Sequence, residues 1–276
     1  MLLLYGCSTL PTAPDRAAVA PIDSASACVA SLVGSSRTAY RELDAADFSI
    51  VSWNIEKGKD PDWASDLAKV RAEPDLLILQ EASPHHEAWE TLAPEHFRSF
   101  TEGFGFNQGA TGVMTVSSAQ PLTECNLVSH EPWFGTRKAT LVTEYGLSDT
   151  NQTLLVINIH GINFTFGVRH LEKQLQKAQA IIAVHKGPVL FSGDFNTWRG
   201  SKARMLEELV QGVGLSPLEF SADYRKRFLG WPLDHIYVRG LDTIYATTQE
   251  LSSSDHNPMS VRFRLMEEQG RINAAR

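Results

Sequence analysis

The chain has 276 residues, of which 43% are hydrophobic, so it can bury a substantial core in one large domain or two small ones. Its formal net charge of −7 gives no sign of the basic field expected of a tight, non-specific nucleic-acid binder. No apolar run reaches the roughly 18 residues that a membrane-spanning helix needs.

The first residues resemble the end of a bacterial lipoprotein signal, because a short apolar stretch leads to Leu4-Tyr5-Gly6-Cys7. No basic residue precedes this stretch, although lipoprotein signals have one there; a start site placed too far downstream would explain its absence. The alternative to a lipoprotein signal is a plain disordered N-terminus. We therefore expect a lipid anchor at Cys7 and a periplasmic or membrane-anchored protein, with a cytoplasmic protein as the alternative. Residues 1–39 are expected to be a signal-like start and flexible arm, since Pro, Ala and Ser are frequent there.

The chain has three cysteines, Cys7, Cys28 and Cys125. If Cys7 carries lipid, the other two are an even pair that could form a disulfide in an oxidising periplasm. Two unrelated buried thiols fit the sequence equally well, because sequence alone does not place two Cβ atoms within bridging distance.

Strand-like and helix-like segments alternate in one expected domain, residues 40–268, which a short tail at 269–276 follows. Runs of β-branched, aromatic and apolar residues predict strands, and apolar residues spaced by three and four predict helices. The expected strands are 48–54, 76–81, 112–116, 138–143, 153–160, 189–192, 235–238 and 259–265, and the expected helices are 62–71, 169–186 and 201–210. Together they predict an α/β sandwich in which two packed sheets are flanked by helices.

Polar residues stand at the ends of these apolar strands, where a soluble core would not require them. A carboxylate such as Glu81, after Leu76 to Gln80, is costly to bury unless something pairs with it. Mg²⁺ is bound in proteins through one or two carboxylates together with water and substrate phosphate oxygens. Any single residue of this kind could be a turn or capping residue, but the set predicts metal-assisted hydrolysis of a phosphate ester. The set is Asn54, Glu81, His160, Asp194, Asn196, Asp234, Asp255 and His256.

Six short motifs in a fixed order resemble the endonuclease/exonuclease/phosphatase superfamily, which includes deoxyribonuclease I, exonuclease III, sphingomyelinases and inositol-polyphosphate 5-phosphatases. The motifs are Trp53-Asn54-Ile55, Leu79-Gln80-Glu81, Asn158-Ile159-His160, Gly193-Asp194-Phe195-Asn196, Leu233-Asp234-His235-Ile236 and Ser254-Asp255-His256-Asn257-Pro258. The resemblance covers roughly residues 47–265. It implies a four-layered α/β sandwich with the active site at one end of the paired sheets.

The resemblance also implies how the metal and the attacking water are handled. Glu81 would bind Mg²⁺ or Mn²⁺, helped by Asn54 and Asp255. Asp194 would orient or deprotonate the attacking water, and Asn196 would hold a phosphate oxygen. Metal and base would thus prepare water for in-line attack.

Further residues are implied to contact the phosphate. His160 would touch it directly, and His256, positioned by Asp234 through a carboxylate–imidazole hydrogen bond, would stabilise the charge that builds in the transition state. Arg137 and Lys138 precede a strand where family members place a phosphate contact, and a solvated pair is the alternative.

Asn163 continues the loop after His160 and is either a further substrate contact or a turn asparagine.

From the residues named above we expect a metal-dependent phosphoesterase, above all a nuclease-like or phospholipase-like phosphodiesterase. A phosphomonoesterase acting on sugar or inositol phosphates and an inactive binding module of the same fold are the alternatives. The expected partner is a phosphate-ester substrate, whether nucleic acid, phospholipid or small molecule, and the protein is expected to be a monomer.

Overall fold

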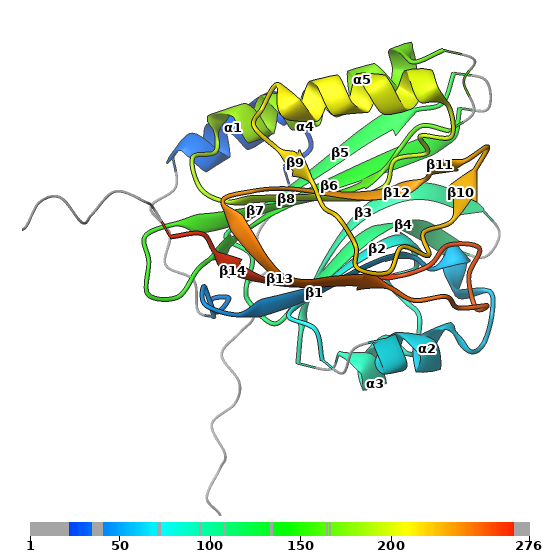
Figure 1. The fold of residues 1–276 in the computed structure, drawn as a ribbon, viewed down its shortest axis with the longest axis horizontal. Helices are drawn as coiled ribbons and strands as arrows, with labels where there is room; N and C mark the ends of the chain where they lie inside the picture. The colour runs from blue at the N-terminus through cyan, green and yellow to red at the C-terminus, as the bar shows by residue number, and fades with distance from the viewer. Residues whose placement is uncertain are drawn as a thin grey trace, which may run out of the picture.

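The computed structural model describes residues 22–34, 41–70, 73–93, 95–106, 109–132, 135–163, 165 and 167–267. Two mixed sheets of six strands face each other, and helices cover both outer faces (Figure 1). This arrangement confirms the α/β sandwich expected from the sequence. Cys7 and the tail at 269–276 lie outside the described residues, and no helix within them is long and apolar enough to cross a membrane.

The two sheets are built from strands that are far apart in the chain. The first sheet has the spatial order β13 (Leu241–Thr248), β14 (Met259–Leu265), β1 (Phe48–Asn54), β2 (Leu76–Ala82), β4 (Gly109–Ser117) and β3 (Phe97–Phe106). The second has the order β5 (Thr123–His130), β6 (Arg137–Gly146), β7 (Thr153–His160), β8 (Val189–Asp194), β12 (Asp234–Arg239) and β9 (Ser216–Pro217). A separate hairpin consists of β10 (Arg227–Phe228) and β11 (Trp231–Pro232).

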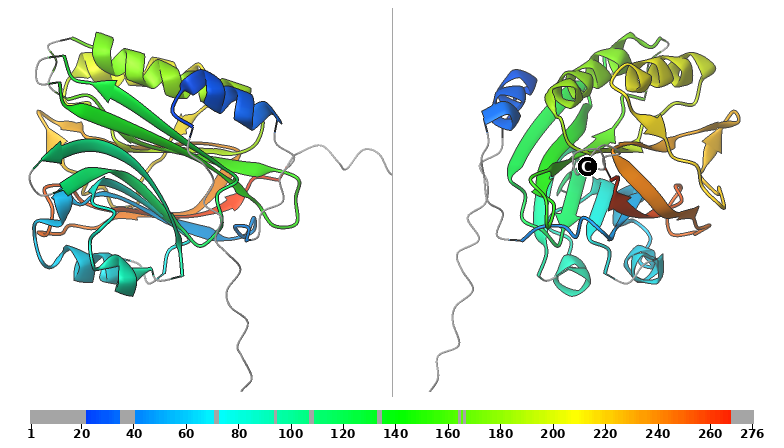
Figure 2. Two further views of the ribbon diagram at one scale, coloured as in Figure 1. Left: turned by 180° about the vertical axis from the view of Figure 1, so that it is seen from behind. Right: turned by 60° about the vertical axis from the view of Figure 1, so that its left-hand side comes forward.

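The helices form the two outer layers (Figures 1 and 2). The second sheet is covered by α1 (Ala25–Gly34), α4 (Arg169–Val184) and α5 (Gly200–Gln211), and the first by α2 (Trp63–Val70) and α3 (Trp89–Leu92). A short 3₁₀ helix, η1 (Glu56–Gly58), follows β1 directly.

The layers enclose separate cores, and β1 shows why its sequence fits this position. All seven residues of β1 are buried. Phe48 and Ile50 belong to the core between the sheets, whereas Val51 and Trp53 belong to the core beneath α2 and α3. Because successive side chains of a strand point to opposite faces, a strand covered on both sides must be apolar throughout.

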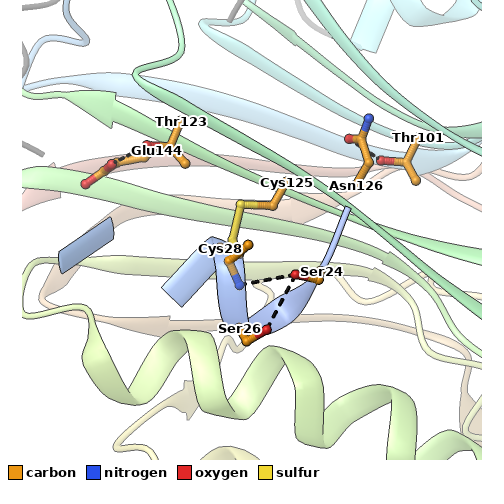
Figure 3. Close-up of a disulfide and its surroundings, with 9 residues drawn as sticks. Ser24, Ser26, Cys28, Thr101, Thr123, Cys125, Asn126 and Glu144 are labelled. Atoms are coloured by element: carbon orange, nitrogen blue, oxygen red, sulfur yellow. Dashed lines mark hydrogen bonds between the residues drawn. A yellow bond between two sulfur atoms is a disulfide. The ribbon is translucent and has the colours of Figure 1, made fainter. Parts of the chain in front are cut away.

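The N-terminal arm differs from the expectation. Instead of a flexible segment as far as residue 39, residues 25–34 form α1, which packs against α4. Cys28 and Cys125 form a disulfide (Figure 3), and their Cα atoms are 5.9 Å apart. The paired cysteines are thus confirmed and the unpaired alternative is wrong. Ile22 also exchanges backbone hydrogen bonds with β5. The Ala- and Ser-rich sequence hid this helix because its stability comes from these tertiary contacts.

Candidate active site

Polar side chains from both sheets meet where the carboxyl ends of four strands come together. β1 and β2 are parallel neighbours with Asn54 beside Gln80, and β7 and β8 are parallel neighbours with His160 beside Asp194. β12 runs antiparallel to β8 and begins at its end, where Asp234 pairs with Asp194. The strand register therefore brings the predicted residues to one edge of the sandwich.

The turn after β8 sets the direction of Asp194. Gly193 has a φ of +144°, and a Cβ at this position would lie 2.1 Å from the carbonyl oxygen of Ile159, so only glycine fits. The backbone N–H of Asn196 donates to Asp194 Oδ1 at 3.0 Å, and Asn196 Nδ2 donates to the carbonyl oxygen of Gly161 at 3.0 Å. These bonds fix the carboxylate relative to the loop after β7.

Asp194 lies at the centre of the site and is 2% exposed. Its Oδ2 accepts a hydrogen bond from Asn54 Nδ2 at 3.2 Å and lies 3.6 Å from His160 Nε2 and 3.8 Å from His256 Nε2. A carboxylate that is held by donors at the edge of a cavity can orient a water molecule and accept its proton.

His256 is held by a second carboxylate. Its Nδ1 lies 2.7 Å from Asp234 Oδ2, and its backbone N–H donates to Ser254 Oγ at 3.1 Å. Burial alone would lower the pKa of His256, but the carboxylates of Asp234 and Asp194 outweigh burial and raise that pKa to about 10. His256 is therefore an imidazolium near neutral pH, with Nδ1 donating to Asp234 and Nε2–H directed toward Asp194.

Glu81 has the properties expected of a ligand for a hard cation. It lies within a bulge of β2, between Leu79 and Ala82, and has a φ of +54°, which is unusual for a residue other than glycine. Its Oε2 is buried and makes no hydrogen bond, although Lys57 Nζ lies 3.2 Å away. With the amide oxygen of Asn54 at the end of the neighbouring strand, this carboxylate offers the oxygen ligands that Mg²⁺ and Mn²⁺ prefer.

Two other places at the site offer metal ligands but fit a metal ion less well than Glu81: the side chain of Asp255, and the cluster of Asp194, Asp234 and His256. The Asp255 side chain is 67% exposed at the cavity, with Oδ1 4.0 Å from His256 Nε2. Ligand atoms of Asp194, Asp234 and His256 also lie within 4.8 Å of one another. However, His256 Nδ1 already donates to Asp234, so the donor set at Glu81 fits a metal ion better.

His160 and Lys138 form a partly buried pair in which the lysine is the donor. Lys138 Nζ lies 2.6 Å from His160 Nε2. Burial, reinforced by the positive charge of Lys138, lowers the pKa of His160 to about 3, so the ring is neutral and its Nε2 accepts. Burial also lowers the pKa of Lys138, against the attraction of Asp194. Arg137 lies at the rim, where its half-exposed side chain is 3.3 Å from Glu102.

Asn163 is anchored at three atoms. Its backbone N–H donates to Glu131 Oε1 at 2.9 Å, its carbonyl oxygen accepts from Lys202 Nζ at 2.9 Å, and its Oδ1 accepts from Trp198 Nε1 at 2.7 Å. Asn163 lines the cavity, and its amide Nδ2 is not used in these three contacts. The orientation of its side chain is therefore fixed by its neighbours.

The site residues surround a cavity of about 440 Å³. Of the residues predicted from the sequence, Asn54 and Asp234 lie behind its wall and support Asp194 and His256. The others line it: Glu81, Arg137, Lys138, His160, Asn163, Asp194, Asn196, Asp255 and His256. The structure therefore brings the whole predicted set together.

Three charged residues at the site were not predicted. Lys57 and Glu131 line the cavity, and Lys202 is a buried lysine of α5 that reaches the loops under it. Lys57 could have been noticed because it closely follows Trp53-Asn54-Ile55. The sequence carries no signal for Glu131 or Lys202, since their positions depend on packing between distant segments.

Comparisons with known proteins agree with this geometry. The sequence model of the Endonuclease/Exonuclease/phosphatase family matches residues 51–256. The chain is 37% identical over 216 residues to a UPF0294 protein of Yersinia enterocolitica, covering 78% of this chain and 82% of the relative. It is 36% identical over 221 residues to a UPF0294 protein of Vibrio campbellii, covering 79% of this chain and 78% of that relative.

Solved structures share the fold at lower sequence identity. The human Nocturnin catalytic domain with bound sulfate superposes with a TM-score of 0.64 at 16% identity, covering 82% of this chain and 97% of that domain. A humanized TDP2 of D. rerio superposes with a TM-score of 0.59 at 17% identity, covering 79% and 99% of the two chains. The protein has a phosphoesterase fold. It belongs to the endonuclease/exonuclease/phosphatase family, whose members are typically hydrolases acting on phosphoester bonds.

Proposed function

We propose that the protein hydrolyses phosphate esters with the help of a divalent metal ion, and that phosphodiesters are its substrates. The observation that carries this proposal is the position of the Asp194 carboxylate between His160 and His256, in a cavity that Glu81 also lines. A base, an imidazolium and a metal-binding carboxylate are the groups that in-line attack of water on phosphorus requires.

In this mechanism Asp194 orients the attacking water and accepts its proton. Asn54 and Asn196 hold the carboxylate in position by donating to it. His256 donates its Nε2–H to a phosphoryl oxygen as negative charge develops there, while Asp234 holds Nδ1 and keeps the ring charged. The proton and the charge are thus handled by two separate groups whose reacting atoms lie 3.8 Å apart.

Other residues bind the phosphate oxygens. Lys138 donates one N–H to His160 and has further N–H groups for an anion in the cavity. Asn163 offers its Nδ2, and Arg137 extends the cationic wall at the rim. Asn196 Nδ2 instead donates to Gly161 and Asp194, so its proposed contribution is to position Asp194.

Glu81 would hold the metal ion, with Asp255 at the rim as a further ligand candidate. The amide oxygen of Asn54 is a third candidate, although it already accepts from the backbone N–H of Glu56 at 3.1 Å. Members of the family generally use a divalent metal. When bound, such an ion neutralises negative charge on the phosphate oxygens.

The cavity supports a diester over a monoester. Its volume of about 440 Å³ is well beyond that of a phosphate group alone and leaves room for a substituent on either side of the phosphorus. A phosphomonoesterase is the second candidate, because Lys57, Arg137 and Lys138 line the same cavity and could balance a dianion.

Hydrolysis of two chromogenic esters tests these alternatives. Bis-p-nitrophenyl phosphate and p-nitrophenyl phosphate are each incubated with Mg²⁺, Mn²⁺ or EDTA, using the wild type and Asp194→Asn. We expect metal-dependent cleavage of the diester that EDTA and the variant abolish. Cleavage of the monoester alone would establish the phosphatase, and equal rates for wild type and Asp194→Asn would contradict the mechanism.

We also propose that the protein is a monomer located in the periplasm and anchored by lipid at Cys7. The disulfide between Cys28 and Cys125 supports an oxidising compartment. The mass of the mature protein from its native host tests the anchor, since lipidation at Cys7 removes the preceding residues and adds acyl chains. An unprocessed mass would contradict it.

A further inference from the structure

Lys57 lies in η1, directly after the strand that carries Asn54. Glu56 and Lys57 have φ angles of +47° and +65°, and Glu81, opposite them, has +54°. Side chains with a Cβ rarely adopt this left-handed conformation, and such residues persist where the surrounding structure holds them. Three of them gather at the proposed metal site, which indicates that the direction in which the Lys57 side chain leaves the backbone is imposed by the fold.

The imposed direction brings Lys57 onto the carboxylate that the metal needs. Lys57 Nζ lies 3.2 Å from Glu81 Oε2, the buried oxygen that makes no hydrogen bond. The Lys57 side chain is 36% exposed and lines the cavity beside His160 and Asp255, so it is not locked in this position. An ammonium and a divalent ion repel each other strongly at such distances, so they compete for the same oxygen.

We propose that Lys57 is a movable counter-charge: it neutralises Glu81 until a divalent metal ion binds there, and it then contacts a phosphate oxygen in the cavity. The inference rests on the proposed function in taking Glu81 as a metal ligand. The flexible four-carbon stem of lysine permits this exchange of partners. Because the metal releases the cation that the anion uses, metal and phosphate binding are positively coupled through Lys57.

The chain offers a matched control for charge at this loop. Lys59 is two residues further on, and its Nζ pairs with Glu56 Oε1 at 2.6 Å with the side chain 56% exposed. Lys57→Gln and Lys59→Gln therefore remove the same charge from the same loop, but Lys57→Gln alone removes it from Glu81. Thermal unfolding of both variants verifies that each is folded.

Mn²⁺ titration by calorimetry, in the absence of substrate, is the first measurement. We expect Lys57→Gln to bind Mn²⁺ roughly tenfold more tightly than the wild type, since a competing cation has been removed. Lys59→Gln should differ from the wild type by less than about twofold, because exposed ion pairs contribute little. Equal Mn²⁺ affinity in Lys57→Gln and the wild type would overturn the proposal.

Inorganic phosphate is titrated next, at saturating Mn²⁺. Lys57→Gln should bind it roughly tenfold more weakly than the wild type and Lys59→Gln, because one cationic contact is missing. If Lys57→Gln binds phosphate as tightly as the wild type, the proposed contact between Lys57 and a phosphate oxygen is overturned. Glu81→Gln distinguishes failure of the proposed metal site from failure of the role proposed for Lys57. If Glu81→Gln does not weaken Mn²⁺ binding, both are contradicted. If Glu81→Gln weakens Mn²⁺ binding but Lys57→Gln has no effect, only the role of Lys57 is contradicted.

Discussion

His256 Nδ1 and Asp234 Oδ2 are 2.7 Å apart, in a pair whose side chains are almost completely buried. The two residues are 22 positions apart in the chain, and Asp234 starts β12 opposite the end of β8. The bond fixes both the orientation and the charge of the ring, because Nδ1 must donate and Nε2 keeps its own proton. It also explains why His256 remains charged despite burial.

Asp234→Asn should therefore reduce the kcat of diester hydrolysis by roughly a hundredfold or more, since the ring loses the carboxylate that keeps it charged and oriented. KM should change much less, because Asp234 does not line the cavity. Steady-state kinetics with bis-p-nitrophenyl phosphate provides the measurement. Asp242→Asn is the control, since this half-exposed aspartate pairs with Arg264 at 3.2 Å. A kcat close to wild type in Asp234→Asn would show that His256 acts without it.

Much of the fold could be predicted because strands buried on both faces are unmistakable in sequence. The observed bounds of β1, β7 and β14 coincide with the expected 48–54, 153–160 and 259–265. β3, β5 and β13 were missed because they contain charged and polar residues on exposed faces, as in the alternating burial of β5. Helix α1 was missed for a different reason, since its position depends on Cys125 and α4, which are distant in the chain.

The catalytic set could be predicted because its members sit in short motifs at strand ends. Their supporting contacts could not. Lys202 lies in the first turn of α5, and nothing in its local sequence shows that it is 1% exposed and reaches the loop at Asn163. Glu131, which receives the backbone N–H of Asn163, lies beyond the end of β5 and belongs to no motif. Such residues become visible only when the packing of distant segments is known.

The disulfide should contribute measurably to stability. It joins residues 97 positions apart, and the loss of chain entropy when a loop of this length is closed in the unfolded chain corresponds to about 4–5 kcal/mol. We expect dithiothreitol to lower the melting temperature of the wild type. The double variant Cys28→Ser with Cys125→Ser should melt at the temperature of the reduced wild type and should not respond to the reductant. A variant that melts like the oxidised wild type would contradict this contribution.

Acid should destabilise the protein through His235. Burial lowers the pKa of His235 to about 3 from an ordinary value of 6.5, and the ring packs against Phe195 and Tyr237. The unfolded chain takes up a proton below 6.5 while the folded ring stays neutral, so this stability is present above 6.5 and is lost as pH falls toward 3. The loss attributable to this group is about 2 kcal/mol near pH 5.

Urea unfolding at a series of pH values checks this expectation. His235→Gln removes the titrating group, so its free energy of unfolding should depend less steeply on pH below neutrality than that of the wild type. His130→Gln serves as the comparison, because His130 is an exposed residue at the end of β5. Parallel pH profiles for the wild type and His235→Gln would refute the assignment.

Lys202 should affect turnover through the loops that it joins. Its Nζ donates to the carbonyl oxygens of Asn163 at 2.9 Å and Asn196 at 3.4 Å, and so ties the loop after β7 to the loop after β8. Burial lowers the pKa of Lys202 to about 8. Lys202→Met removes one donor from each of these carbonyl groups, of which that of Asn163 keeps the backbone N–H of Thr165 at 2.9 Å, and it also removes a buried charge. The free energy of unfolding should therefore change by less than about 2 kcal/mol.

Turnover should respond more strongly than stability, because Asn163 and Asn196 lose their common anchor while the fold remains. We expect the kcat of Lys202→Met to fall by roughly tenfold to a hundredfold, as small displacements of catalytic groups do. Lys177→Met is the matched control, since Lys177 Nζ also donates to a carbonyl oxygen, that of Val128 at 3.0 Å, but outside the site. If both variants lose stability alike and neither loses turnover, Lys202 has only a structural role.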